Sequence, residues 1–114
     1  NGLNYANGVI GILEGNYKKA ADLFGNATTN NAALANILNE NNGAARKALD
    51  NNERANATTS YLKAILAART NNVEELVKNL SNAIKANPDY KAKALKDVEF
   101  INFLENAAFA ALLK

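Results

Sequence analysis

Cysteine and histidine are both missing from this chain of 114 residues. Without cysteine the chain can form neither a disulfide nor a thiolate nucleophile. Without histidine it has no side chain whose ordinary pKa lies near neutral pH, the group that general acid–base catalysis uses most often. A Ser-His-Asp triad built on Ser60 or Ser81 is therefore excluded. We expect no enzymatic activity.

Long apolar runs and a dominant charge are also missing. No stretch approaches the roughly 18 apolar residues of a membrane span, and no signal-peptide pattern opens the chain. Thirteen basic and eleven acidic residues give a net charge of +2, spread without a block. This balance predicts neither nucleic-acid binding nor membrane insertion. The chain begins at Asn1 rather than at a methionine, which we interpret as the mark of a piece processed or excised from a longer protein.

Metal and nucleotide sites are not predicted either, so we expect no cofactor. No group of Asp and Glu has the spacing of a calcium loop, and zinc would lack a soft ligand. Gly8, Gly11 and Gly15 resemble a phosphate-binding loop only superficially, because Gly8 and Gly11 lie inside a helical pattern. Glu74-Glu75 could form a carboxylate pair, but we place them in the first turn of a helix, where negative charge complements the helix dipole.

Asparagine is abundant and often paired, as in Asn41-Asn42 and Asn71-Asn72. Its amide bonds the local backbone and it tolerates left-handed φ, so the main interpretation is that these residues cap helices and form turns. A second interpretation is glycosylation, because three triplets fit the acceptor pattern. They begin at Asn26, Asn56 and Asn79.

Apolar residues recur at three- and four-residue spacing along the whole chain, and no useful stretch alternates with a period of two. The pattern predicts an all-α protein in which short turns join antiparallel helix pairs. The single proline, Pro88, ends one pair, because proline forces the residue before it out of helical geometry. The predicted helices span residues 2–14, 17–27, 32–38, 44–49, 57–68, 73–86, 90–95 and 98–113, the last being one helix or two with a break at Glu105-Asn106.

The first and third pairs share an internal repeat. Four positions in each pair have identical spacings of 12, 4 and 3, with small residues at the first and fourth, a large apolar residue at the third, and Ala20 or Leu76 at the second. A small residue in the first helix lets the second helix cross closely, and the large residue fills the space beside the crossing. The two sets are Gly8, Ala20, Phe24, Ala27 and Ala64, Leu76, Leu80, Ala83.

On these residues the chain resembles a tetratricopeptide repeat (TPR) protein. The run from Gly8 through Gly15-Asn16-Tyr17 to Ala27 matches the motif, although Asn7 and Gly11 depart from it. The resemblance implies a right-handed α-solenoid of about three repeats plus terminal helices, forming a single domain over residues 1–114. Its repeats would span about 2–29, 31–52 and 57–87, with a shortened middle repeat, and its terminal helices 89–113. The closing Asp97…Phe100 and Phe109…Leu113 are similar to the ends of bacterial cell-envelope TPR proteins of the Bacteroidetes type, so the resemblance favours a cell-envelope or extracellular location.

The resemblance also implies where a partner binds. In such solenoids the first helix of each pair lines a concave face that takes peptides. Tyr5 and Tyr61 occupy the same repeat position, and they are expected either to bind a partner or to pack in the core against a neighbouring helix. The predicted partner-binding residues are Tyr5, Val9, Ile12, Leu13, Tyr61, Ile65 and Arg69.

Two non-catalytic functions therefore stay open. The first is a scaffold that binds a protein or peptide through the concave face. The alternative is a structural subunit whose copies stack end to end into an oligomer or filament, because the terminal faces of a solenoid are apolar unless they are capped. The apolar last stretch, 98–113, keeps this alternative open.

Overall fold

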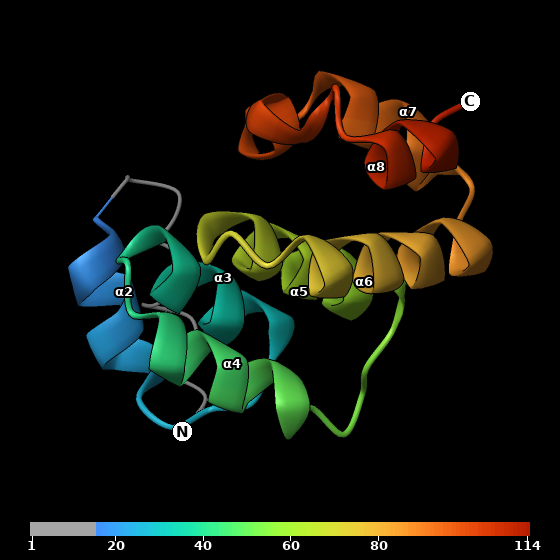
Figure 1. Cartoon of the computed structure of the whole chain (residues 1–114). Coiled ribbons are helices and arrows are strands. Elements are labelled where there is room, and N and C mark those ends of the chain that lie inside the picture. Colours follow the sequence, from blue (N-terminus) through green and yellow to red (C-terminus); the bar gives the residue numbers. More distant parts are fainter. Residues whose placement is uncertain (1–15) are drawn as a thin grey trace. The chain divides into compact units, whose positions relative to one another are not determined.

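The computed structural model describes residues 16–114, and all regular structure within them is helical. The helix predicted at 2–14 lies outside the described residues. The all-α prediction is confirmed for the described part, and Figure 1 shows its elements in chain order. They are α2 (Tyr17–Phe24), α3 (Asn30–Leu38), α4 (Asn42–Asp50), α5 (Ala57–Arg69), α6 (Val73–Ala86), α7 (Asp89–Lys96), the 3₁₀ helix η1 (Val98–Phe103) and α8 (Ala107–Leu112).

The chain divides into two compact units between Arg54 and Ala55. The first unit contains α2, α3 and α4, and the second contains α5 to α8. The boundary falls between the second and third predicted helix pairs. Each unit is described by itself below.

Asparagine side chains begin most of these helices. Asn16, Asn41, Asn56, Asn72 and Asn106 each accept a hydrogen bond from the backbone N–H three residues later, at 3.1–3.2 Å. Each bond satisfies a donor that the first turn of a helix leaves open, and such a cap stabilises a helix by about 1 kcal/mol. The capping interpretation of the asparagines is thus confirmed at these five positions.

The same residue type also ends helices. Asn71 has a φ of 56°, and the backbone N–H of Asn72 donates to the carbonyl of Ala67 at 2.8 Å. This is the bond of a Schellman turn, in which a left-handed residue closes the helix. Asn72 then caps α6, so the pair Asn71-Asn72 both ends one helix and begins the next. Glu40, with a φ of 62°, and Asn41 do the same between α3 and α4.

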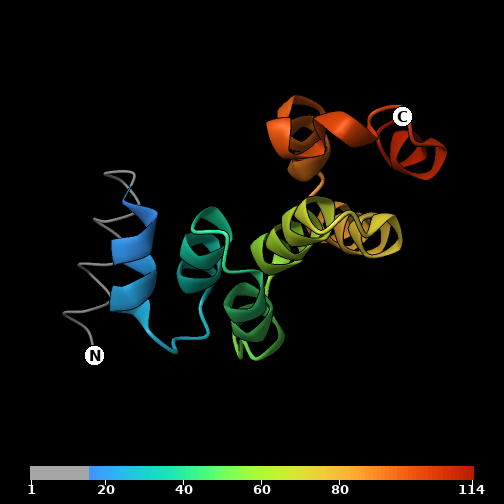
Figure 2. The ribbon, with the colours of Figure 1, turned by 60° about the vertical axis from the view of Figure 1, so that its left-hand side comes forward.

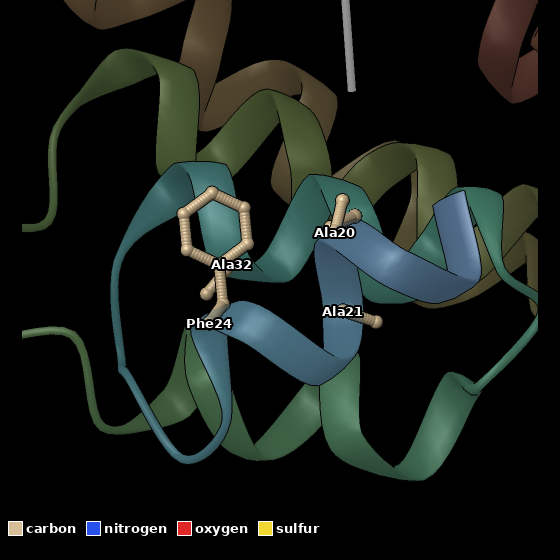
Figure 3. Packing of buried hydrophobic residues seen from close by; sticks show 5 residues of the cluster. Ala20, Ala21, Phe24 and Ala32 are labelled. Atoms are coloured by element: carbon tan, nitrogen blue, oxygen red, sulfur yellow. The ribbon is translucent and has the colours of Figure 1, made fainter. Parts of the chain in front are cut away.

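The first unit packs along a seam of alanines. Its cluster combines one aromatic side chain, Phe24, with alanines from α2 and α3, and Figure 3 shows the Phe24 ring beside Ala32. Small side chains let α2 approach α3 closely, while the ring fills the remaining space. The buried members are Ala20, Ala21, Phe24, Ala32 and Ala35, with the half-buried Ala27 beside them. Helix α4 packs on α3 in turn, and its buried side chains are Ala45, Ala48 and Leu49.

The second unit is built on a helical hairpin. Helices α5 and α6 run side by side, joined by Thr70–Asn72 (Figures 1 and 2). Leu76, Leu80 and Ala83 are fully buried on α6, the three positions that the internal repeat singled out. The chain then continues through α7, η1 and α8; α7 and α8 contact α6, and η1 contacts α5. The predicted break at Glu105-Asn106 is confirmed, because it separates η1 from α8.

Two details differ from the expected helices. The helix predicted at 17–27 ends at Phe24, because Gly25 takes a φ of 57° and a ψ of −122°, a conformation outside the helical range that glycine adopts readily. The first part of the last predicted stretch is a 3₁₀ helix rather than an α-helix. The second predicted pair is shorter than the third, since α3 and α4 have nine residues each whereas α5 and α6 have 13 and 14.

Truncation of a buried leucine should separate core packing from helix propensity. We expect Leu80→Ala, at a side chain with 0% exposure on α6, to lower the free energy of unfolding by about 2–5 kcal/mol. Leu95→Ala makes the same change on α7 at a side chain that is 52% exposed, and should change it by about 0.5 kcal/mol or less. Urea unfolding followed by circular dichroism measures both. Equal losses in the two variants would contradict the α6 packing.

Candidate partner-binding surface

Tyr61 lies in the first half of α5, behind a reciprocal cap at the helix start. Asn56 accepts from the Thr59 N–H, and the Thr59 hydroxyl accepts from the Asn56 N–H. The Tyr61 side chain is only 3% exposed. Its ring stacks on Tyr90 of α7 at a centroid distance of 4.7 Å and meets Phe100 of η1 edge-on at 5.6 Å. Both are favourable geometries for aromatic pairs.

The Tyr61 hydroxyl donates a hydrogen bond to Oδ2 of Asp97 at 2.5 Å. The other oxygen of that carboxylate accepts from the backbone N–H of Glu99 at 3.0 Å and so caps η1. Burial raises the pKa of Tyr61 well above its ordinary value of 10.0, and the hydrogen bond to the Asp97 carboxylate raises this pKa further. Asp97 therefore fixes the start of η1 and its attachment to α5 at the same time.

Two further contacts hold α7 at this place. The hydroxyls of Thr58 and Tyr90 share a hydrogen bond of 2.7 Å. The Lys93 ammonium lies 5.2 Å from the ring centroid of Tyr61 and 5.8 Å from that of Tyr90. These distances are within the range of a cation–π interaction.

Arg69 forms the far end of the same face of α5. Its Nε donates to Oε1 of Glu99 at 2.8 Å and its Nη2 to Oε2 at 2.7 Å, a two-pronged ion pair. The two side chains are 28% and 21% exposed, so the pair is partly shielded from solvent. Ile65, 8% exposed, lies between Tyr61 and Arg69 at a spacing of four residues. Residues spaced by four share one face of a helix.

The structure therefore brings Tyr61, Ile65 and Arg69 together on one face of α5. At both ends of that face the contacts are made by the chain's own residues 89–104, which we call the 89–104 segment. The sequence left two roles open for Tyr61, partner binding and core packing against a neighbouring helix. Its contacts with the 89–104 segment correspond to the second role. The role of the three residues in binding a separate partner stays a prediction. Tyr5, Val9, Ile12 and Leu13 lie outside the described residues.

A second surface was missed by the sequence reasoning. Among the described residues, five large hydrophobic side chains are more than a third exposed, and four of them lie between residues 95 and 104. They are Leu95 at 52%, Val98 at 77%, Ile101 at 62% and Leu104 at 43%. Beside Val98 an open hollow of about 420 Å³ is lined also by Lys93, Lys96 and Asp97. The three-residue spacing of Val98, Ile101 and Leu104 was visible in the sequence, but it marks one face only once a 3₁₀ helix is known.

No three acidic side chains within residues 16–114 lie close enough together to hold a metal ion. Glu74 and Glu75 lie in the first turn of α6, where they complement the helix dipole as predicted. No helix in this part of the chain has the length and apolar character needed to cross a bilayer.

The three glycosylation triplets differ in accessibility. Asn79 is 9% exposed, and its amide donates to the carbonyl of Glu75 at 2.9 Å, so a glycan there is incompatible with the fold. The side-chain oxygen of Asn56 caps α5. Asn26 is exposed in the turn after α2. Asn26 and Asn56 are thus both exposed acceptors, whereas Asn79 is not.

The raised pKa of Tyr61 makes stability depend on alkaline pH. The unfolded chain releases this proton near pH 10.0 while the folded chain retains it, so the stabilisation is complete below pH 10.0 and is lost as the pH rises above that value. We expect the free energy of unfolding to fall by up to about 1.4 kcal/mol per pH unit from this group. Tyr61→Phe should lack this pH-dependent contribution. Its free energy of unfolding at pH 7 should be about 1–3 kcal/mol lower than that of the wild type.

Urea unfolding between about pH 8 and about pH 11 measures the effect. All other titratable groups are common to the wild type and Tyr61→Phe, so the difference between these two slopes isolates the tyrosine. Tyr17→Phe, at a side chain that is 37% exposed, is the matched control and should keep the wild-type slope. An unchanged slope in Tyr61→Phe would show that Tyr61 is not the group responsible.

Comparison with known proteins found no match to this chain among protein-family models, curated proteins or solved structures. The relationship to TPR proteins therefore stays a prediction from the repeat. Function has to be argued from the residues of the chain itself.

Proposed function

We propose that this chain is a non-catalytic scaffold that binds a protein or peptide through the concave face of a TPR-like, right-handed α-solenoid. The partner would contact the first helix of successive pairs. The proposed contact residues are Tyr5, Val9, Ile12 and Leu13 in the first pair and Tyr61, Ile65 and Arg69 in the third.

The observation that supports this proposal is the way α5 holds the 89–104 segment. One helix face provides an aromatic platform at Tyr61 and a two-pronged cation at Arg69. The segment provides the complementary groups, an aromatic ring at Tyr90 and a carboxylate at Glu99. Aromatic stacking and paired Arg–carboxylate bonds are the interactions that protein interfaces concentrate at their strongest points. A face of this kind is suited to holding a short helical segment.

In the third pair the 89–104 segment already covers this face of α5. A separate partner would have to displace that segment. The first pair has Tyr5 at the repeat position of Tyr61, and Val9 and Leu13 at those of Ile65 and Arg69. Replacement of the arginine by leucine removes the carboxylate-binding group. We therefore propose that the first pair binds its partner through aromatic and aliphatic contacts, with Tyr5 as the main anchor.

The alternative function is a structural subunit that stacks end to end. The exposed side chains of Val98 and Ile101 support it, because apolar groups on the last part of a solenoid are suited to a following copy. Stacking of one end on another is heterologous and does not close, so the assembly would grow with concentration. Light scattering that shows unlimited growth of mass would favour this alternative over the scaffold.

Panning of the full chain against displayed random peptides of about 15 residues tests the scaffold, because a helix-binding groove selects ligands of this size. We expect enriched peptides whose affinity falls at least about tenfold with Tyr5→Ala, the loss typical of an aromatic anchor. Fluorescence anisotropy of the labelled peptides measures the affinity, and circular dichroism checks that the helices persist.

Tyr17→Ala is the matched control, since it removes a 37% exposed tyrosine that is not on the proposed face. It should change the affinity by less than about twofold, as surface positions outside an interface do. Failure to enrich any peptide, or equal losses in the two variants, would contradict the proposed binding face.

A further inference from the structure

Exposed apolar side chains gather on η1 and its C-terminal neighbour. Val98 is 77% exposed, Ile101 62% and Leu104 43%. In a 3₁₀ helix, residues three apart stack above one another because each turn contains three residues. Leu104 keeps helical φ and ψ of −58° and −30°. These three residues therefore form one continuous face, which we call the apolar stripe.

The opposite side of η1 attaches the stripe to the second unit. Phe100 is fully buried and Phe103 is 8% exposed, and the Phe100 ring also packs against Phe109 of α8 at 5.6 Å. The cap from Asp97 and the ion pair from Arg69 to Glu99 fix the same element. The stripe is thus held on a rigid support, and its exposure is not a consequence of a loosely attached end.

Charges of opposite sign flank the apolar stripe. Lys93 and Lys96 line the hollow at its Val98 end. The carboxylates that lie nearest in the chain, Asp97 and Glu99, are directed to Tyr61 and Arg69 of α5. Beyond Leu104 comes the exposed carboxylate of Glu105. The stripe therefore has a basic end and an acidic end, with Ile101 at its centre.

We propose that the apolar stripe binds the same stripe of a second copy of this chain, with the two copies antiparallel about a two-fold axis at Ile101. In that arrangement Ile101 meets Ile101, and Val98 of each copy meets Leu104 of the other. Lys96 of each copy then lies near Glu105 of its partner, so both ends of the contact are complementary in charge. A two-fold axis always pairs a surface patch with itself in this reciprocal way.

Charge excludes the parallel arrangement of the same two stripes. Parallel copies would bring Lys96 beside Lys96 and Glu105 beside Glu105, and like charges in contact are unfavourable. In the antiparallel arrangement the two apolar stripes cover each other, so no third component is required. Because three apolar side chains from each copy bury far less area than a stable interface, the dimer is expected to be weak and dependent on concentration.

This inference goes beyond the proposed function, because it uses neither Tyr5 nor the α5 face. It also differs from end-to-end stacking, since a two-fold contact closes and stops at two copies. The measured mass should therefore rise with concentration toward twice 12.2 kDa and not exceed it.

Sedimentation equilibrium of the full chain from about 10 µM to about 1 mM, the range of weak contacts, tests the dimer. Ile101→Asp should weaken association more than about tenfold, because it places two facing carboxylates in the centre of an apolar contact. Tyr17→Asp introduces the same group at an exposed side chain on α2 and should leave association unchanged. A wild-type chain that stays monomeric to about 1 mM, or equal effects of the two variants, would overturn the proposal.

Charge exchange tests the antiparallel orientation. Lys96→Glu and Glu105→Lys should each weaken self-association by about three- to tenfold, because each replaces two attractions by two repulsions. An equimolar mixture of the two variants, and the variant that carries both changes, should recover the wild-type affinity within about twofold. Single changes that leave association unchanged, together with a mixture that associates more tightly than the wild type, would indicate parallel copies, and growth beyond two copies would indicate open stacking. Either result would overturn the proposal.

Discussion

Helices of eight or nine residues are too short to persist in isolation, so α2, α3 and α4 depend on the close approach that alanine permits. Ala20, Ala32 and Ala35 are fully buried where α2 meets α3, and one ring, Phe24, fills the space that they leave. A larger side chain at any of these alanines would force the helices apart. Without this seam the asparagine caps would have no stable helices to begin or end.

The turns between packed helices are short, and asparagine helps to form them. Asn71-Asn72 joins α5 to α6 by giving one residue the left-handed conformation and the next residue the capping role. Two residues thereby satisfy the open groups of two helix ends. This local chemistry accounts for the asparagines at the helix starts and for Asn71, and the buried amide of Asn79 shows that an acceptor triplet can serve the fold alone.

The hairpin of α5 and α6 supports two different surfaces. On α5, Tyr61 and Arg69 hold the 89–104 segment through a hydroxyl–carboxylate bond and a paired ion bond. That attachment directs Phe100 inward and leaves Val98 and Ile101 outward on the same 3₁₀ helix. The buried face shows which contacts this fold uses to hold a helical segment, and the exposed face leaves large apolar side chains open to solvent.

Periodicity in the sequence was sufficient for the all-α class, the order of the helices and the buried Leu76, Leu80 and Ala83, because helix formation and capping depend on residues three or four apart. Sequence also placed Tyr61, Ile65 and Arg69 on one face, since spacing by four is a local property. Only the tertiary structure decided what covers that face. The contacts of Tyr61 with Asp97 and of Arg69 with Glu99 join residues 36 and 30 positions apart, a separation that no local pattern encodes. Tertiary packing also decides the exposure of Val98 and Ile101. Phe100 and Phe103 are buried on one side of the 3₁₀ helix, which leaves Val98 and Ile101 exposed on another.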